Sequence, residues 1–161
     1  MDIDTRLAAL DARVRRLEDQ RKIREVLAAY GFNADLGRSD AWVDLWTDDG
    51  IYDLDAGAHS GRAQLQDLIA APANYHKSIE NRSQHIALNP HIRIDGDTAV
   101  VECYRMLVVK PADEAKVGAG AYTRFELVRR GDGWAIRRQT RRMTGGDEWG
   151  GRLLRDYLVA G

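Results

Sequence analysis

The sequence has one cysteine, Cys103, among its 161 residues. A single thiol excludes an intramolecular disulfide framework, and a reducing compartment is the default setting for such a chain. No apolar run approaches the roughly 18 residues of a membrane-spanning helix. The first ten residues, MDIDTRLAAL, also lack the basic-then-apolar pattern of a signal peptide. We therefore expect a cytoplasmic protein that does not act at a membrane.

A strong excess of one charge sign is also missing, because 24 basic residues face 25 acidic ones and the formal net charge is −1. Such a chain generates no overall field that would recruit nucleic acid or a membrane surface. Metal-binding motifs are absent too. The four histidines form neither an HExxH motif nor a helical pair at i and i+4: His59, His76, His85 and His91. We predict no metal site.

What the chain does have is 44% hydrophobic and 30% charged residues, which is ordinary for a globular domain. Its length supports one domain with a sizeable core. We predict a single domain over residues 1–161, with an N-terminal helical extension at 1–16 and a C-terminal tail at 145–161.

The first half of the chain has helical periodicity. Apolar residues recur every three or four positions over 5–37, with a polar interruption around Asp19 and Gln20. The spacing predicts two helices there, the first of which could pack on a neighbouring subunit. A short helix follows over 40–46, TDDG at 47–50 reads as a turn, and a third helix is predicted over 61–70.

From residue 83 the pattern changes to four strand-like runs: 85–94, 98–110, 121–130 and 133–143. The tight turns DGD and GDG predict antiparallel hairpins between them. Helices followed by a meander of strands indicate an α+β fold, with the helices packed over a strongly curved, mostly antiparallel sheet. That curvature makes an internal pocket an expected feature.

Three stretches of the chain resemble the SnoaL-like, nuclear transport factor 2-like superfamily: YGFNADLGRSDAWVDLWTDDGIYDL (30–54), GDTAVVECY (96–104) and GDGWAI (131–136). The resemblance covers about residues 17–144 and implies a cone-shaped α+β barrel. Its nearest pattern is that of scytalone dehydratase, hexachlorocyclohexane dehydrochlorinase and bile acid 7α-dehydratase. That group implies a catalytic aspartate at Asp35, a catalytic histidine at His85 and a tyrosine at Tyr30, with no cofactor.

Those three residue types suit the removal of water from neighbouring carbons. One imidazole can take the proton and then protonate the departing hydroxide, because its pKa lies near neutrality. A carboxylate fixes the imidazole tautomer, and a phenol can polarise a carbonyl. Spacing alone does not support Tyr30 with Asp35, because five residues turn a helix by about 140°.

Aromatic and aliphatic side chains are expected to line a hydrophobic substrate pocket: Trp46, Tyr52, Tyr104, Met106 and Tyr122. Arginines that crowd the last strands could hold an anionic group of the substrate. Arg141 and Arg142 compete for the arginine position of the bile acid dehydratase pattern. Arg124 is a further candidate. Related proteins more often carry an acidic residue or a histidine near this position, so Arg124 is a departure from the scytalone dehydratase pattern.

The sequence thus predicts a cofactor-independent, dehydratase-type lyase acting on a hydrophobic cyclic small molecule. Isomerisation, cyclisation and dehydrochlorination share the same first proton abstraction and stay open. The alternative is a non-catalytic ligand-binding or assembly module, such as the small subunit of ring-hydroxylating dioxygenases. Several of the lyases that the chain resembles are trimers, and one sheet face here needs covering. The resemblance therefore implies a homo-oligomer, a trimer before a dimer.

Overall fold

A computed structural model describes residues 2–110 and 114–145 of the chain. Helices and strands follow one another as α1 (Ile3–Asp35), α2 (Ser39–Val43), β1 (Trp46–Leu54), β2 (Gly57–Ser60), α3 (Arg62–Ala70), α4 (Tyr75–Ser78), β3 (Ser83–Asp95), β4 (Thr98–Val109), β5 (Lys116–Arg130) and β6 (Gly133–Met143). In that part of the chain, no helix is both long enough and apolar enough to cross a bilayer.

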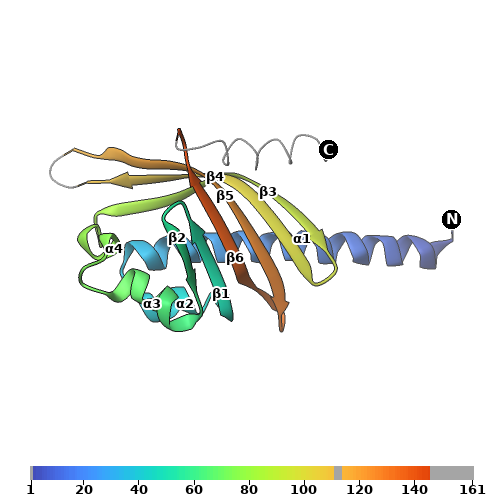
Figure 1. Cartoon of the computed structure of the whole chain (residues 1–161). Coiled ribbons are helices and arrows are strands. Elements are labelled where there is room, and N and C mark those ends of the chain that lie inside the picture. The colour runs from blue at the N-terminus through green and yellow to red at the C-terminus, as the bar shows by residue number, and fades with distance from the viewer. Residues whose placement is uncertain (1, 111–113, 146–161) are drawn as a thin grey trace.

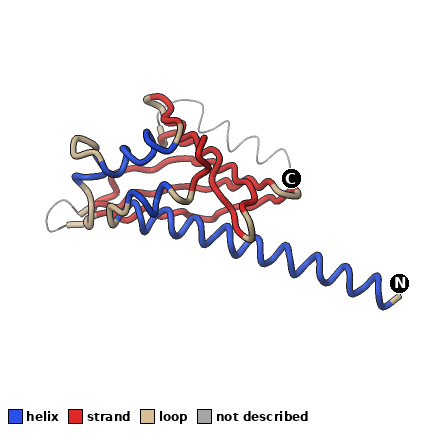
Figure 2. The backbone as a smooth tube through the Cα atoms, turned by 90° about the horizontal axis from the view of Figure 1, so that it is seen from below, coloured by secondary structure: helices blue, strands red, loops and turns tan. Residues whose placement is uncertain are grey.

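Within the described residues, six strands form one sheet in the order β2-β1-β6-β5-β4-β3. Strands β3 to β6 pair antiparallel in sequence order, and β1 pairs antiparallel with β2 and parallel with β6. The helices lie against a curved sheet (Figures 1 and 2). The predicted α+β cone with a mostly antiparallel sheet is confirmed.

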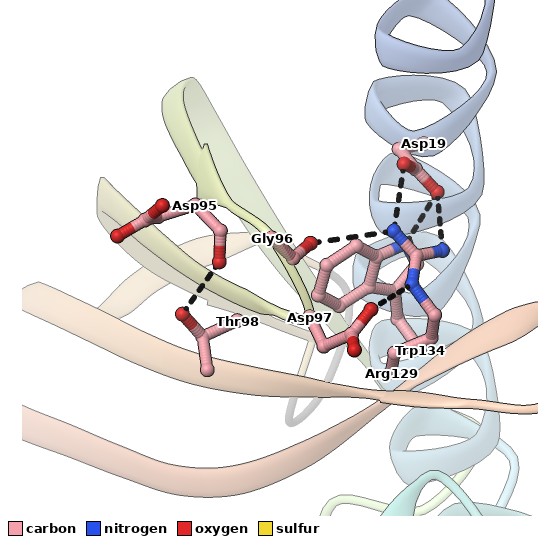
Figure 3. Close-up of polar contacts among 7 residues, drawn as sticks. All are labelled: Asp19, Asp95, Gly96, Asp97, Thr98, Arg129 and Trp134. Carbon is pink, nitrogen blue, oxygen red and sulfur yellow. Dashed lines mark hydrogen bonds and ion pairs between the residues drawn. The ribbon is translucent and has the colours of Figure 1, made fainter.

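The predicted break near Asp19 is wrong, because α1 is one continuous helix of 33 residues. Its C-terminal half packs on β3 and β6, and its N-terminal half projects beyond the sheet (Figure 1). Asp19 does not interrupt the helix because its carboxylate pairs with side chains of the sheet. Both its oxygens accept from Arg129 at 2.9 Å, and Oδ1 also accepts from Trp134 Nε1 at 3.0 Å (Figure 3).

The predicted turn at 47–50 is also wrong, because these residues belong to β1. The register of β1 against β6 shifts between Trp46 and Ile51, so the polar TDDG segment is accommodated as an irregularity of the strand. A second irregularity interrupts β3 between Leu88 and His91, where Asn89 has a φ of 51°. This disturbance next to Pro90 agrees with the sequence, since proline cannot donate to the ladder.

The interior of the cone is filled with aromatic rings. Five of them contact one another with centroid separations of 5.1–6.5 Å: Tyr30, Trp42, Trp46, Tyr52 and Phe125. All five are almost completely buried. This cluster joins α1 and α2 to the concave face of the sheet and leaves the space near the start of β3 as the place for a polar site.

Candidate functional site

Asp35, the last residue of α1, meets His85 near the start of β3. Asp35 Oδ1 lies 2.7 Å from His85 Nδ1, and Asp35 Oδ2 accepts from the backbone N–H of His85 at 2.9 Å. Ser83 Oγ donates to Oδ1 at 2.7 Å. The carboxylate therefore holds both the ring and the main chain of the histidine, which fixes the position of the imidazole.

A glycine allows α1 to approach β3 closely enough for this contact. A Cβ atom built on Gly31 would lie only 2.7 Å from the backbone oxygen of His85. Gly31 stands four residues before Asp35, about one helical turn away and on the same side of α1. The missing side chain at Gly31 thus brings the Asp35 carboxylate within hydrogen-bond reach of β3.

The surroundings keep both partners in useful protonation states. Burial lowers the pKa of His85, and this outweighs the opposing hydrogen bond to Asp35. Burial acts to raise the pKa of Asp35, but hydrogen bonds from His85 and Ser83 leave it below its usual value. Near neutral pH the pair is a carboxylate and a neutral imidazole. Since Asp35 engages Nδ1, the other nitrogen, Nε2, is left to accept a proton.

A second histidine stacks on the first. The rings of His76 and His85 lie 5.4 Å apart at an interplanar angle of 21°. Burial lowers the pKa of His76 to about 4, helped by His85, Arg141 and Arg105. His76 Nδ1 is buried without a hydrogen-bond partner among the described residues. His76 is therefore a neutral, desolvated ring that covers one side of the His85 imidazole.

Two arginines complete the site. Arg105 is only 7% exposed, and its guanidinium lies over the Tyr30 ring, 4.4 Å from the centroid. Arg141 lies 5.8 Å from the centroid of the Tyr52 ring. A small cavity is lined by residues of β3 to β6: His85, Arg105, Met106, Leu107, Ala119, Ala121, Arg141 and Met143. Its free space is about 20 Å³, room for about one water molecule.

The three predicted catalytic residues do not all meet. Asp35 and His85 are in direct contact, whereas Tyr30 lies in the aromatic cluster and is linked to the site through Arg105. Burial raises the pKa of the Tyr30 phenol. Trp46 and Tyr52, predicted to contact substrate, are buried in the same cluster. Met106 does line the cavity beside His85.

Four predicted substrate-binding residues lie on the other face of the sheet: Tyr104, Tyr122, Arg124 and Arg142. Arg105 and Ala121 are register partners on the cavity side, so their neighbours Tyr104 and Tyr122 point the opposite way. The two tyrosine rings pack together 5.2 Å apart. The predicted placement of these four residues in the pocket of His85 is therefore corrected.

The arginines among them have acidic partners on that outer face. Arg142 pairs with Asp53 at 2.9 Å, and Arg124 lies near Glu102 and Glu126 at 3.7 and 3.6 Å. Of the two arginines that the sequence left in competition, Arg141 lines the cavity.

Three residues of the site escaped the sequence analysis as site residues: His76, Ser83 and Arg105. Ser83 carried a signal, because it stands two residues before His85 and so shares its face of a strand. Arg105 stands three residues after Glu102, so the two occupy opposite faces of a strand, but alternation alone does not show which of them points inward. No sequence signal marked His76, because it lies in α4, a four-residue helix whose position against β3 is set by tertiary packing. Within the described residues, no group of three or more potential metal ligands comes together.

A cone of helices packed on a curved, six-stranded mixed sheet is the architecture of nuclear transport factor 2-like domains. The chain belongs to the SnoaL-like domain family, whose model matches residues 15–140. A search of curated proteins gave no match.

Solved structures agree with this assignment. A nuclear transport factor 2-like protein with a cystatin-like fold from Novosphingobium aromaticivorans is 29% identical, with a TM-score of 0.84 over 92% of this chain and 96% of that one. A candidate scytalone dehydratase from the same organism is 16% identical, with a TM-score of 0.67 over 81% and 87% of the two chains. A candidate aromatic ring hydroxylase, also from that organism, is 22% identical, with a TM-score of 0.61 over 83% and 96%. The last two likenesses concern the fold.

Proposed function

We propose that this protein is a cofactor-independent lyase of the dehydratase type. In this proposal His85 Nε2 removes a proton from a carbon of a hydrophobic, cyclic small molecule. The imidazolium that forms then protonates the hydroxyl group leaving from the neighbouring carbon, so that water and a carbon–carbon double bond are produced. Asp35 orients the ring and stabilises its cationic form.

The observation that carries the proposal is the hydrogen bond of 2.7 Å between Asp35 Oδ1 and His85 Nδ1. It leaves a neutral base with a defined tautomer beside a small cavity. A general base acts best when it is unprotonated at the working pH and held in one orientation. The lowered pKa of His85 meets the first condition, and the triple hold of the Asp35 carboxylate on His85 and Ser83 meets the second.

Two supporting residues have different roles in this proposal. Arg105, beside His85 in the cavity, would stabilise negative charge that develops on a carbonyl oxygen next to the reacting carbon. Tyr30 becomes a positioning residue, because its ring lies under the Arg105 guanidinium. A cavity of about 20 Å³ does not accommodate a carbon ring. Substrate entry therefore requires flexible lining side chains such as Met143 to move.

The first test is the titration of His85 followed by NMR in the wild type and in the Asp35→Asn variant. We expect the pKa of His85 in the wild type to lie below 6.5. It should fall further in the variant, because the carboxylate that favours the imidazolium is lost. An unchanged pKa would rule out a functional pair. Arg124→Gln, on the outer face, is the matched control.

The second test is a screen of hydroxylated steroid and aromatic ketones for loss of water, with His85→Ala beside the wild type. Activity that depends on His85 supports the lyase. Activity that persists in His85→Ala contradicts the mechanism. Products with rearranged double bonds and no loss of water would instead assign an isomerase on the same site.

The filled interior favours a second candidate, a non-catalytic assembly or ligand-binding module. Five aromatic rings occupy the space where a large ligand would lie, which suits a scaffold. The two candidates differ in one measurement. A scaffold needs no coupling between Asp35 and His85, whereas the lyase requires it.

A further inference from the structure

The cavity beside His85 has more positive charge than the described residues neutralise. Arg105 and Arg141 both line it, and arginine stays protonated when buried. In the part of the chain that the structure describes, Asp35 is the only carboxylate in contact with the histidine pair, and it already accepts hydrogen bonds from His85 and Ser83. Among the described residues, neither arginine has a carboxylate partner within 4.0 Å, and Arg141 Nε is buried without any hydrogen-bond acceptor.

An uncompensated buried cation is costly, and proteins normally pair it. Elsewhere on this sheet the rule holds, because Arg129, Arg138 and Arg142 each have an aspartate at 2.7–2.9 Å. Arg105 and Arg141 depart from it at one place, and that place holds the candidate base.

We propose that the cavity binds a carboxylate group of the ligand between Arg105 and Arg141. This proposal rests on the proposed function, because it names the substrate class as a cyclic acid whose carboxylate lies next to the carbon that loses a proton. Two guanidinium groups match the planar, two-oxygen geometry of a carboxylate. A carboxylate also enters a small cavity more readily than a ring, which can stay at its mouth.

The experiment adds formate, acetate and benzoate to the intact chain and follows the His85 and His76 ring signals by NMR. Other groups facing these rings are Asp35, Arg105 and Arg141. A bound anion should raise the pKa of His85, because it offsets the two cations. We expect saturable shifts for at least one acid and none for benzamide, which has the shape of benzoate without its charge.

Arg141→Gln should weaken binding about tenfold or more, and Arg105→Gln should do the same if the variant folds. Arg124→Gln on the outer face should bind as the wild type does. Equal responses to benzoate and benzamide, or full binding by Arg141→Gln, would overturn the anion site. The outcome is separable from the proposed function, because neutral ketones could still lose water through His85 if the anion site failed.

The projecting part of α1 carries a second, independent feature. Residues 2–18 are all exposed, and five of them form an apolar stripe that is 51–73% exposed: Ile3, Leu7, Leu10, Val14 and Leu17. Their spacing alternates strictly between four and three residues, which is the heptad pattern of a coiled coil. With Leu7 and Val14 at a, the other three occupy d.

The charges beside this stripe follow the same register. Every e position is acidic (Asp4, Asp11 and Glu18), and the first two g positions are basic (Arg6 and Arg13). In a parallel pair of helices, a g residue meets the e residue of the next heptad on the other helix. Arg6 would then face Asp11 of a second copy, and Arg13 would face its Glu18. An antiparallel pair would instead place like charges together.

The body of the protein leaves room for such a pair. The residues of α1 that pack on the sheet form a different stripe: Ile23, Leu27, Tyr30, Gly31 and Ala34. At 3.6 residues per turn, this buried stripe lies roughly 135° around the helix axis from the exposed one. Two copies joined along residues 3–17 would therefore hold their sheets away from the shared helical contact.

We infer that residues 3–17 associate in parallel with the same segment of a second copy of this chain. The first test is cross-linking with an added cysteine at either end of the stripe, in Ile3→Cys and Leu17→Cys. Parallel pairing predicts that each variant forms a disulfide with itself. Antiparallel pairing would give cross-links only when the two variants are mixed, and would overturn the inference.

A charge exchange tests the register. Asp11→Arg with Glu18→Arg should shift sedimentation towards the monomer, and adding Arg6→Glu with Arg13→Glu should restore association. Arg15→Glu with Arg16→Glu, on positions b and c, is the matched control and should not change assembly. A wild type that stays monomeric at all concentrations would also overturn the inference. A parallel dimer or a parallel trimer would support it.

Discussion

Two aspartates on α1, sixteen residues apart, each tie the helix to the sheet, and their surroundings differ. Asp19 binds Arg129 through both oxygens and Trp134 Nε1 through one, while Arg129 also pairs with Asp97 at 2.7 Å (Figure 3). The Arg129 guanidinium lies 4.6 Å from the centroid of the Trp134 ring. Both direct partners of Asp19 have a fixed charge or none, so this contact acts as a structural clamp between α1 and the sheet.

At the other end, Asp35 binds a titratable partner, His85, beside two arginines that have no carboxylate partner among the described residues. In the proposed function, this difference separates a structural contact at Asp19 from a reactive one at Asp35. A structural ion pair is complete by itself, whereas a reactive site keeps a proton acceptor and charges that a ligand must complete.

The largest expected effect is on turnover. His85→Ala should lower the rate of elimination by about 100- to 10,000-fold, because a positioned general base contributes about that much. Asp35→Asn should lose part of the same factor. The Asp19→Asn variant, assayed under conditions where it is folded, should keep its rate per molecule. Equal rate losses in Asp19→Asn and Asp35→Asn would show that both ends act only through stability.

The next effect is on stability and has the opposite pattern. Asp19→Asn should lower the free energy of unfolding by about 2–3 kcal/mol, because Arg129 loses its bidentate, largely buried partner. Urea denaturation measures this. Trp134→Phe, which removes only the indole N–H donor and some packing, is the partial control. A stability change of Asp19→Asn within the experimental error would contradict the clamp.

The strands that contact both ends of this part of α1 could be predicted from the sequence. Periodicity of two in four runs and tight glycine turns predicted the antiparallel meander, and all four strands are present. The continuous α1 was missed because Asp19 and Gln20 break the apolar stripe. The sequence does not reveal that Arg129, 110 residues later, supplies the partner that makes a polar residue suitable there.

Only part of the candidate site could be predicted, because the sequence does not show which distant elements come into contact. Asp35 and His85 were named from the resemblance, and they do meet. Assigning faces failed for Tyr104 and Tyr122, because a strand's alternation fixes which residues share a face and leaves open which face is inside. On β4 the residue that faces the cavity is Arg105, next to Tyr104. His76 could not be placed, since its contact with His85 joins two elements that no sequence pattern relates.

The pH dependence of stability should separate the two ends. Burial holds the pKa of His76 at about 4 against about 6.5 in the unfolded chain, so the unfolded state binds more protons below pH 6.5. Stability is therefore complete above this value and falls with pH, by about 2 kcal/mol between pH 7 and pH 5. His76→Gln should remove this contribution in urea titrations, and a remaining slope of the same sign is expected from His85, whose pKa is also lowered by burial.

Asp19→Asn is the control for this slope. The pKa of Asp19 is lowered, chiefly by the hydrogen bond from Arg129. Its contribution is present above the unfolded value near 4 and is lost only as pH falls below it. The variant should therefore keep the wild-type slope between pH 7 and pH 5. A slope there that His76→Gln does not change would contradict the burial of a neutral His76.

The smallest expected effect tests whether the Asp35 end depends on close packing. Gly31→Ala places a methyl group where His85 O is 2.7 Å away, so β3 must move. Overpacking costs about 1–3 kcal/mol, and the gain in helix propensity returns up to about 1 kcal/mol, which leaves a net loss of about 1 kcal/mol.

The shift separates Asp35 from His85, so the pKa of His85 should change while the Trp134 indole signal at the Asp19 end stays in place. Gly133→Ala, whose nearest neighbour would be Arg130 O at 3.7 Å, should leave the pKa of His85 unchanged. If Gly31→Ala left that pKa unaltered, the Asp35–His85 contact would not depend on the approach of α1 to β3, and the two ends of the helix would differ only in their partners.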